Sequence, residues 1–364
     1  MSGNRDAMGV AKSDLETPAL CLDIAVYRRN VERITSYLRD RGVAWRPHMK
    51  GQKAPELATQ ALAAGAIGVT CATVYEAEVM ASAGVASILI GNQIAGDRKT
   101  RRLARLEQQA SVIAATDSAV HLAQLASAAA AEGTTIPVVI ELNVGMNRCG
   151  VAPGAAALDL ARLAHTTRGL RLAGLMGWEG HVLSFEPEEK RRRIQAAIGE
   201  LVRTAEMCRD AGLPVDVVSA AGSGTFLDSA NCAGITEVQA GGAVFSDLSY
   251  QKWGLEHEFA LTVLTRVVSR PSATRIIVDG GFKTMSSQHG LPKPLIPSVV
   301  KSLVLSAEHG NLEMEEPSEW PRVGDVVEFI PGYTDSTLCL HDQMCVIRDG
   351  VLEAVWVIPG RMGR

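Results

Sequence analysis

Eight short, β-rich apolar runs alternate with Ala- and Leu-rich segments between residues 45 and 239, and this alternation restricts the fold of the chain most. The runs are 45–48, 67–71, 87–90, 112–115, 138–142, 172–176, 217–219 and 237–239. The segments between them, such as 54–64 and 120–132, carry apolar residues at helical spacing, which predicts a crossover helix after each strand. Eight such units favour an α/β fold of the (β/α)8 barrel type, although an open doubly wound sheet gives nearly the same local pattern.

The pattern changes after about residue 255, where strand-like runs follow one another without helical segments between them. The runs are 259–268, 275–278, 298–305, 325–330, 344–347 and 354–358, with turn sequences at 279–281, 309–311 and 349–350. This pattern is typical of a second, mainly antiparallel β domain, and the run 19–23 is a candidate strand of it. We therefore expect a flexible tail (1–16), a barrel (24–255) and a β domain (17–23 plus 256–364).

Composition and missing motifs narrow the function. The 36 basic and 40 acidic residues give a net charge of −4 with no long run of either sign, which argues against nucleic acids and membrane surfaces as partners. The seven cysteines form no C-x-x-C pair, which favours the reducing cytoplasm over a disulfide framework. The P-loop, H-E-x-x-H and G-x-S-x-G motifs are absent from the sequence. A small molecule is the expected partner.

The predicted first strand ends in Arg46-Pro47-His48-Met49-Lys50. Barrel enzymes carry their chemistry at the carboxyl ends of the strands, so Lys50 is expected at the mouth of the barrel. A lysine there can form a Schiff base with an aldehyde cofactor or a carbonyl substrate. A solvated lysine at a strand end is the alternative interpretation.

Two loops of small residues follow the predicted seventh and eighth strands, at 219–225 and 239–242. Glycines there let backbone N–H groups approach an anion closely, and the hydroxyls of Ser223 and Thr225 add donors. Because barrels use these two loops for phosphate, the pair predicts a cofactor that carries a phosphate group. A single loop of small residues would be equally consistent with an ordinary turn that binds no ligand.

Two further polar segments end predicted strands, at 143–150 and 178–181. They bring Asn, Arg and His side chains to the end of the predicted barrel where Lys50 is expected. His181 is a candidate general base, and a histidine that merely hydrogen-bonds within its loop is the alternative.

The order of several motifs along the chain is informative. They are Glu16-Thr17-Pro18-Ala19-Leu20, Arg46 to Lys53, Gly145 to Gly150, Gly222 to Thr225, Asp335 and His341-Asp342. Together they resemble the D-threonine aldolase and D-serine dehydratase family of pyridoxal 5'-phosphate enzymes, which have an alanine-racemase-like barrel and a C-terminal β domain. The resemblance implies a homodimeric lyase that acts on D-β-hydroxy-α-amino acids by retro-aldol cleavage. Dehydratase-like β-elimination, racemisation and a cofactor carrier without turnover remain alternatives.

The resemblance also implies site residues. Lys50 is expected to bind pyridoxal phosphate covalently, and Lys50, Tyr333 and His181 are the expected catalytic residues. The other residues expected around the cofactor are Arg148, Ser219, Gly222, Ser223, Gly224, Thr225, Gln239, Gly241, Gly242 and Tyr250.

One position departs from the family pattern. Family members usually carry a His, one further residue and then an Asp or Cys as metal ligands, whereas this chain has Tyr333-Thr334-Asp335. A neutral phenol is a poor ligand for Mn²⁺ or Zn²⁺, so we expect divalent metal binding at Asp335 to be weak, altered or absent. Tyr333 is alternatively an acid/base group close to the cofactor.

Overall fold

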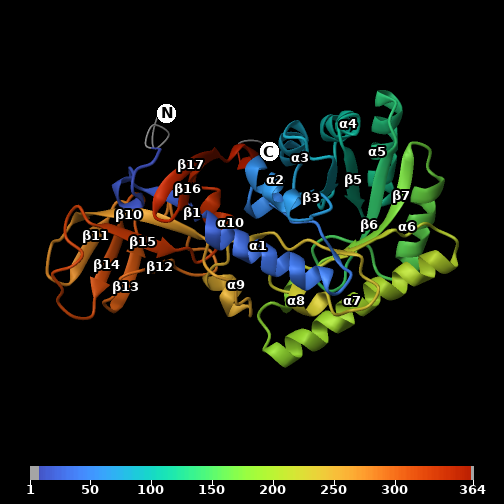
Figure 1. Ribbon diagram of the computed structural model, residues 1–364. Helices are drawn as coiled ribbons and strands as arrows, with labels where there is room; N and C mark the ends of the chain where they lie inside the picture. The colour runs from blue at the N-terminus through green and yellow to red at the C-terminus, as the bar shows by residue number, and fades with distance from the viewer. Residues whose placement is uncertain (1–7, 362–364) are drawn as a thin grey trace. The chain divides into compact units, whose positions relative to one another are not determined.

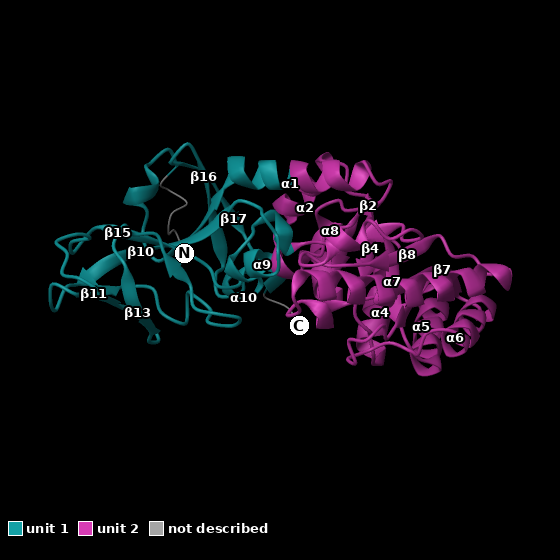
Figure 2. Cartoon of the chain, turned by 90° about the horizontal axis from the view of Figure 1, so that it is seen from below, with its two compact units in different colours: residues 1–31, 242–361 teal, residues 32–241, 362–364 magenta. Residues whose placement is uncertain are grey.

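The computed structural model describes residues 8–361, which form two compact units (Figure 1, Figure 2). The described part of unit 1 comprises residues 8–31 and 242–361, and that of unit 2 comprises residues 32–241. One boundary falls inside helix α1 (Ile24–Arg39), and the other falls between Gly241 and Gly242.

Unit 2 contains the sheet of eight parallel strands that the sequence predicts, in the order β2-β9-β8-β7-β6-β5-β4-β3. The strands are β2 (Ala44–Trp45), β3 (Val69–Cys71), β4 (Ser87–Ile90), β5 (Ser111–Thr116), β6 (Ile136–Leu142), β7 (Leu170–Gly177), β8 (Val217–Ala220) and β9 (Glu237–Val238). The two ends of the sheet are joined by backbone hydrogen bonds from Ile67 to Trp45 and from Thr70 to Pro47, both of 2.9 Å. The sheet therefore curls, and the predicted barrel-like α/β fold is confirmed.

Helices connect these strands, and a side chain caps the start of two of them. They are α2 (Pro55–Ala63), α3 (Val74–Ser82), α4 (Asp97–Leu106), α5 (Ala119–Glu132), α6 (Ala155–Thr166), α7 (Pro187–Asp210) and α8 (Phe226–Ser229), with the 3-10 turns η3 (Met49–Gly51) and η4 (Gly180–Val182). Thr73 and Ser118 cap the starts of α3 and α5 with their side chains, and Gly133 ends α5 at a positive φ of 68°. Successive helices α3, α4 and α5 stand side by side (Figure 1). No helix within residues 8–361 is long and apolar enough to cross a membrane.

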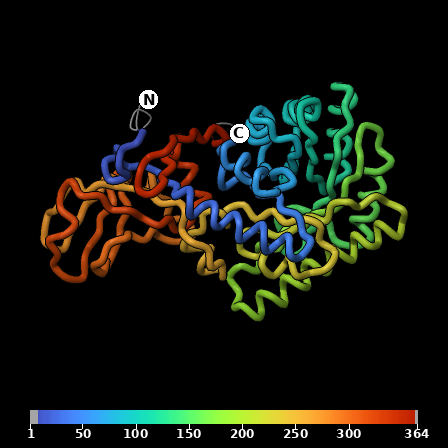
Figure 3. Tube along the Cα trace, viewed as in Figure 1, coloured from blue at the N-terminus to red at the C-terminus, as the bar shows by residue number. Residues whose placement is uncertain are grey.

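Unit 1 is built on a nine-stranded, mainly antiparallel sheet. Its strands are β1 (Ala19–Asp23), β10 (Leu261–Ser269), β11 (Arg275–Val278), β12 (Lys293–Pro294), β13 (Val300–Leu305), β14 (Gly310–Met314), β15 (Val326–Ile330), β16 (Gln343–Arg348) and β17 (Val351–Val357). Strand β1 pairs antiparallel with β10 and parallel with β16, so the blue beginning and the red end of the chain lie side by side (Figure 3).

Unit 1 also contains short helices that the sequence pattern does not predict. They are α9 (Leu248–Lys252) and α10 (Thr334–Leu338), with the 3-10 turns η2 (Lys12–Asp14), η5 (Gly242–Val244) and η6 (Pro359–Arg361). Segments of three to five residues are too short to show helical periodicity, which is why the sequence gives no signal for them. Strand β14 begins at Gly310, inside a predicted turn.

The observed boundaries of the units differ from the expected domain boundaries at 23 and 255. Residues 24–31 and 242–255 belong to unit 1, because the buried Asn30 side chain donates hydrogen bonds to the carbonyl oxygens of Val244 and Glu258. The Tyr27 ring also packs against the Phe245 ring, with the two centroids 6.1 Å apart.

The described part of the expected tail is not loose. The backbone N–H of Gly9 donates to the carbonyl oxygen of Leu352, and Leu15 is only 1% exposed. Burial of one apolar side chain and backbone pairing hold residues 8–16 against strand β17 and its turn. Residues 1–7 of that expected tail lie outside the described residues.

Candidate active site

Lys50 lies in the 3-10 turn η3, directly after strand β2, where the sequence places it. The Nδ1 atom of His48 accepts a hydrogen bond of 3.3 Å from the backbone N–H of Lys50 and caps this turn. The Lys50 side chain is exposed, and no described residue forms an ion pair or hydrogen bond with its amine. The Lys53 amine, in contrast, is paired with the buried carboxylate of Glu76. Lys50 is therefore the lysine of this segment whose amine is open to a ligand.

His48 is a further residue of this segment, and its type and position in the sequence do not by themselves predict a role for it. Its side chain is half-buried, and loss of solvent around the ring, followed by the positive charges of Lys50 and Lys53, holds the pKa of His48 well below its usual value. The imidazole is therefore neutral, and because Nδ1 accepts a hydrogen bond, its proton sits on Nε2. His48 fixes the backbone that carries Lys50, and its place two residues before the lysine is the only sequence signal for that role.

The two loops of small residues lie at the carboxyl ends of the neighbouring strands β8 and β9. A Cβ atom added at Gly222 would lie 2.5 Å from the Trp178 ring, and one added at Gly241 would lie 2.1 Å from the carbonyl oxygen of His48. The backbone N–H groups of Gly224 and Gly241 donate no hydrogen bond to any described residue. The loops therefore combine closely packed backbone with open donors, as anion sites require.

Buried polar side chains support these loops. Gln239 donates a 2.9 Å hydrogen bond to the Ser219 hydroxyl, and the Thr225 hydroxyl accepts one of 3.1 Å from the N–H of Gly222. The carboxylate of the fully buried Glu179 accepts hydrogen bonds from the Ser229 hydroxyl (2.7 Å) and from the backbone after strand β8. The sequence gives no signal for Glu179 except its place beside Trp178 at the end of the predicted sixth strand.

His181 and Arg148 lie after the carboxyl ends of two further strands of unit 2, β7 and β6. His181 lies in η4 after strand β7, and a Cβ atom added at Gly145 would lie 2.6 Å from its ring. The Nδ1 atom of His181 is buried and has no hydrogen-bond partner among the described residues. Arg148 is exposed in the loop after strand β6. The predicted meeting of segments 143–150 and 178–181 is therefore observed, with one imidazole nitrogen unpaired.

The remaining candidates, Tyr250, Tyr333 and Asp335, form a cluster within unit 1. The Tyr333 hydroxyl donates a 3.1 Å hydrogen bond to Oδ2 of Asp335, and the Tyr250 hydroxyl donates one of 3.2 Å to Oδ1. Tyr250 also packs against Gly242, where an added Cβ atom would lie 2.3 Å from its hydroxyl oxygen. Burial, followed by the charge of Asp335, raises the pKa of Tyr333 above its usual range. Tyr333 therefore remains a protonated phenol that donates to Asp335.

The residues around Lys50 fit pyridoxal phosphate, whereas the residues around Asp335 do not fit a metal ion. An open amine on Lys50 and the open N–H donors of Gly224 and Gly241 suit an aldehyde that carries a phosphate, as pyridoxal phosphate does. The donor set around Asp335 does not suit a metal, because its nearest oxygen donors are two protonated phenols. Within residues 8–361, no cluster of three or more His, Cys, Asp and Glu side chains is arranged to hold a metal ion.

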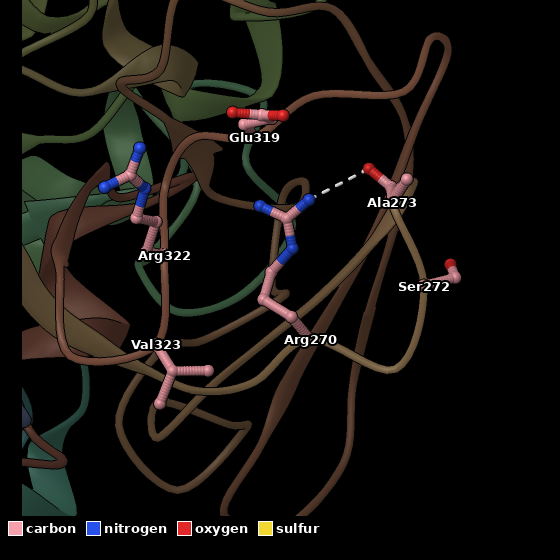
Figure 4. A pocket seen from close by; sticks show the side chains of 6 residues that line it. All are labelled: Arg270, Ser272, Ala273, Glu319, Arg322 and Val323. Carbon is pink, nitrogen blue, oxygen red and sulfur yellow. Dashed lines mark hydrogen bonds between the residues drawn. The ribbon is translucent and has the colours of Figure 1, made fainter.

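A separate hollow lies on the surface of unit 1 (Figure 4). It is lined by Arg270, Ser272, Ala273, Glu319, Arg322 and Val323. The guanidinium of Arg270 donates to the carbonyl oxygens of Ala273, Ser318 and Pro321 and is therefore engaged in holding these loops together. None of the residues expected at the active site lines this hollow.

Comparisons with known proteins show the family to which the chain belongs. Residues 22–249 match the family described as alanine racemase, N-terminal domain, and residues 260–347 match a serine dehydratase domain. The chain is 33% identical to a D-threonine aldolase from Arthrobacter sp., with 95% of this chain and 93% of the relative covered. It is 31% identical to a 3-hydroxy-D-aspartate aldolase from Paracoccus denitrificans, with 97% and 94% covered.

A solved structure extends the similarity to the fold. The crystal structure of D-threonine aldolase from Filomicrobium marinum matches with a TM-score of 0.94 and 34% identity, and 97% of each chain is covered. Both family matches and this structure span the regions that carry Lys50, the glycine loops and the Tyr333 cluster. The chain belongs to the D-threonine aldolase and D-serine dehydratase family of alanine-racemase-like proteins.

Proposed function

We propose that this chain is a pyridoxal-phosphate-dependent lyase that cleaves D-β-hydroxy-α-amino acids by a retro-aldol reaction. The products are glycine, or a related amino acid, and an aldehyde. Its aldolase relatives, which are similar over nearly the full length of the chain, support the reaction. The observation that carries the proposal is the open amine of Lys50 in a unit whose neighbouring strands β8 and β9 end in loops with unpaired N–H donors.

Named residues would hold the cofactor. We assign the covalent attachment to Lys50 and the phosphate contacts to the backbone of Gly222, Gly224 and Gly241 and the hydroxyls of Ser223 and Thr225. Arg148, Ser219, Gln239, Gly242 and Tyr250 complete the proposed cofactor-binding set. When bound, pyridoxal phosphate supplies an electron sink for the electron pair left at Cα when the bond to Cβ breaks.

The chain must also move protons. Retro-aldol cleavage needs a base that takes the proton of the β-hydroxyl and an acid that returns a proton to Cα. We assign the base to His181, whose Nδ1 atom has no partner among the described residues and can accept a proton. We assign the acid to Tyr333, whose hydroxyl carries a proton and hydrogen-bonds to the Asp335 carboxylate.

Product identification tests the proposal. The purified holoenzyme is incubated separately with D-threonine, D-serine and D-alanine, and aldehyde, keto acid and L-enantiomer are assayed. Acetaldehyde and glycine in equal amounts from D-threonine are the expected products. Keto acid without aldehyde would indicate the dehydratase alternative, which the match of residues 260–347 to a serine dehydratase domain favours. Formation of the L-enantiomer would indicate a racemase, and no product from any substrate would indicate a carrier.

We also propose that the enzyme is a cytoplasmic homodimer. The seven cysteines are all free, as expected of a protein from a reducing compartment. Symmetric dimers are the commonest oligomers of soluble proteins, and the family resemblance points the same way.

A further inference from the structure

We propose that this enzyme holds no divalent metal ion at Asp335, because the hydroxyls of Tyr250 and Tyr333 bracket its carboxylate, and that Tyr333→His converts the same place into a metal site. The inference deepens the proposed function, since it concerns the chemistry of the same family position. Its main test measures bound metal rather than turnover, so that result stands or fails separately from the lyase assignment.

The bracket places one phenol on each oxygen of the carboxylate. The Tyr333 hydroxyl lies 3.1 Å from Oδ2, and the Tyr250 hydroxyl lies 3.2 Å from Oδ1. Each O–H group directs its partly positive hydrogen at the oxygen that a cation would have to bind. A divalent ion at Asp335 would be limited to the lone pairs that these two hydrogen bonds leave, and it would lie beside two protonated phenols, which are poor ligands.

The surrounding groups do not offer a replacement ligand set. The Tyr333 hydroxyl donates its hydrogen to Asp335, and a phenol that keeps its proton is a poor metal ligand. The His289 ring lies edge to face with the Tyr333 ring, with centroids 4.9 Å apart, and also contacts the Trp253 ring. No hydrogen bond or ion pair joins His289 to Asp335 within the described part of the chain. Among the described residues, the side chains that hydrogen-bond to the Asp335 carboxylate are therefore two phenols, and no imidazole does so.

A second carboxylate, that of the fully buried Asp247, holds Tyr250 and Asp335 in place. Oδ1 of Asp247 accepts a 2.7 Å hydrogen bond from the backbone N–H of Tyr250, which caps helix α9. Oδ2 of Asp247 accepts hydrogen bonds of 2.7 and 2.8 Å from the backbone N–H and hydroxyl of Thr334, at the start of helix α10. Asp247 thus ties together the two helix starts that carry Tyr250 and Asp335. The phenols are held at the carboxylate by the backbone and not only by side-chain rotamers.

Metal content tests the proposal directly. Purified holoenzyme and variants are equilibrated with Mn²⁺, and bound and free ions are counted by electron paramagnetic resonance and elemental analysis. The wild type is expected to bind Mn²⁺ only weakly and below one equivalent. Tyr333→His is expected to bind close to one equivalent, with affinity higher by at least about tenfold, because imidazole joins the freed carboxylate oxygen. Adding Tyr250→Phe to this variant frees the other oxygen and is expected to tighten binding further.

Matched variants assign any bound ion. Tyr333→His combined with Asp335→Asn is expected to lose the new site, and Tyr75→His, on helix α3 in unit 2, is expected to behave like the wild type. One equivalent of Mn²⁺ in the wild type that disappears in Asp335→Asn would overturn the proposal. So would a Tyr333→His variant that keeps the wild-type melting temperature and cofactor absorbance but gains no metal affinity.

Chelation of the wild type provides a check that needs no variant. Aldehyde production is expected to persist after dialysis against EDTA. Complete loss of activity that Mn²⁺ restores to the full rate would show that a metal is used and would overturn the inference. An enzyme that makes no aldehyde under any condition would contradict the proposed function but would leave the metal-binding result to be judged by itself.

Discussion

Lys50 and Lys53 stand three positions apart, and one ion pair distinguishes them. Lys53 is bound to the buried Glu76, whereas the Lys50 amine is open. Lys50→Ala is therefore expected to abolish the visible absorbance of covalently bound pyridoxal phosphate, while Lys99→Ala on helix α4 keeps it. Borohydride reduction and peptide mapping of the wild type should label Lys50, and a label on Lys53 would contradict the assignment.

Tyr333 is expected to act through its hydroxyl. Tyr333→Phe removes the donor but keeps the ring that packs against Trp253 and His289. We expect kcat to fall by on the order of 10²- to 10⁴-fold, which is the usual contribution of a positioned proton-transfer group, with cofactor absorbance unchanged. Tyr75→Phe, which removes a hydroxyl elsewhere in the chain, should leave kcat unchanged. A nearly silent Tyr333→Phe variant would indicate that Tyr333 only packs at the turn.

Asp247 gives the stability of the protein a pH dependence. Burial raises the pKa of Asp247 from 3.8 to about 7, so the folded chain holds a proton that the unfolded chain releases at lower pH. Its contribution to the unfolding free energy is therefore largest below about pH 4 and falls by at most about 4 kcal/mol as the pH rises to 7. Because Asn does not titrate, Asp247→Asn should cost less stability at pH 8 than at pH 5. Urea unfolding of both proteins at several pH values checks this, and a cost that grows with pH would contradict it.

At the scale of elements, an ion pair joins the two shortest strands of unit 2. The guanidinium of Arg46 on the segment after β2 donates to both oxygens of Glu237 on β9 at 3.0 Å, and to the Ser87 hydroxyl on β4 at 2.9 Å. Both charged side chains are at most 5% exposed. The pair therefore adds side-chain contacts where strands β2 and β9 share a ladder of only two residue pairs.

Breaking this pair is expected to destabilise unit 2. Glu237→Gln leaves the Arg46 charge buried without a counter-ion, so we expect the unfolding free energy to fall by about 3 to 5 kcal/mol. Asp159→Asn, in the exposed pair with Arg162 on helix α6, should change it by less than about 1 kcal/mol. Denaturant titration of the two variants measures both values, and equal small effects would show that the buried pair contributes no more than a surface pair.

At the scale of the whole molecule, the expected assembly is a homodimer. Light scattering at micromolar concentration should give twice the chain mass of 38.7 kDa for the active holoenzyme. A monomer mass with full activity under the same conditions would contradict the dimer and would show that one chain is sufficient for turnover.

The short elements of unit 1 mark the limit of what periodicity predicts. Strands β2 to β7 of unit 2 were predictable because each is followed by a helix of at least nine residues, and strand β6, for example, is buried along all seven of its residues. Helices α9 and α10 have five residues each and are fixed by Asp247 and by the turn between Pro331 and Tyr333. Such contacts leave no pattern in the local sequence.

The sequence by itself determined the order of the elements, the position of Lys50 after a strand and the glycine loops after two others, because these depend on residue type and on neighbours along the chain. Only the tertiary structure decided which groups meet. Tyr250 and Asp335 are 85 residues apart in sequence, and Arg46 and Glu237 are 191 apart. Asn30 joins unit 1 through carbonyl groups more than 200 residues away. Local periodicity is set by residues a few positions apart, whereas hydrogen bonds and ion pairs of this kind depend on how distant segments fold together.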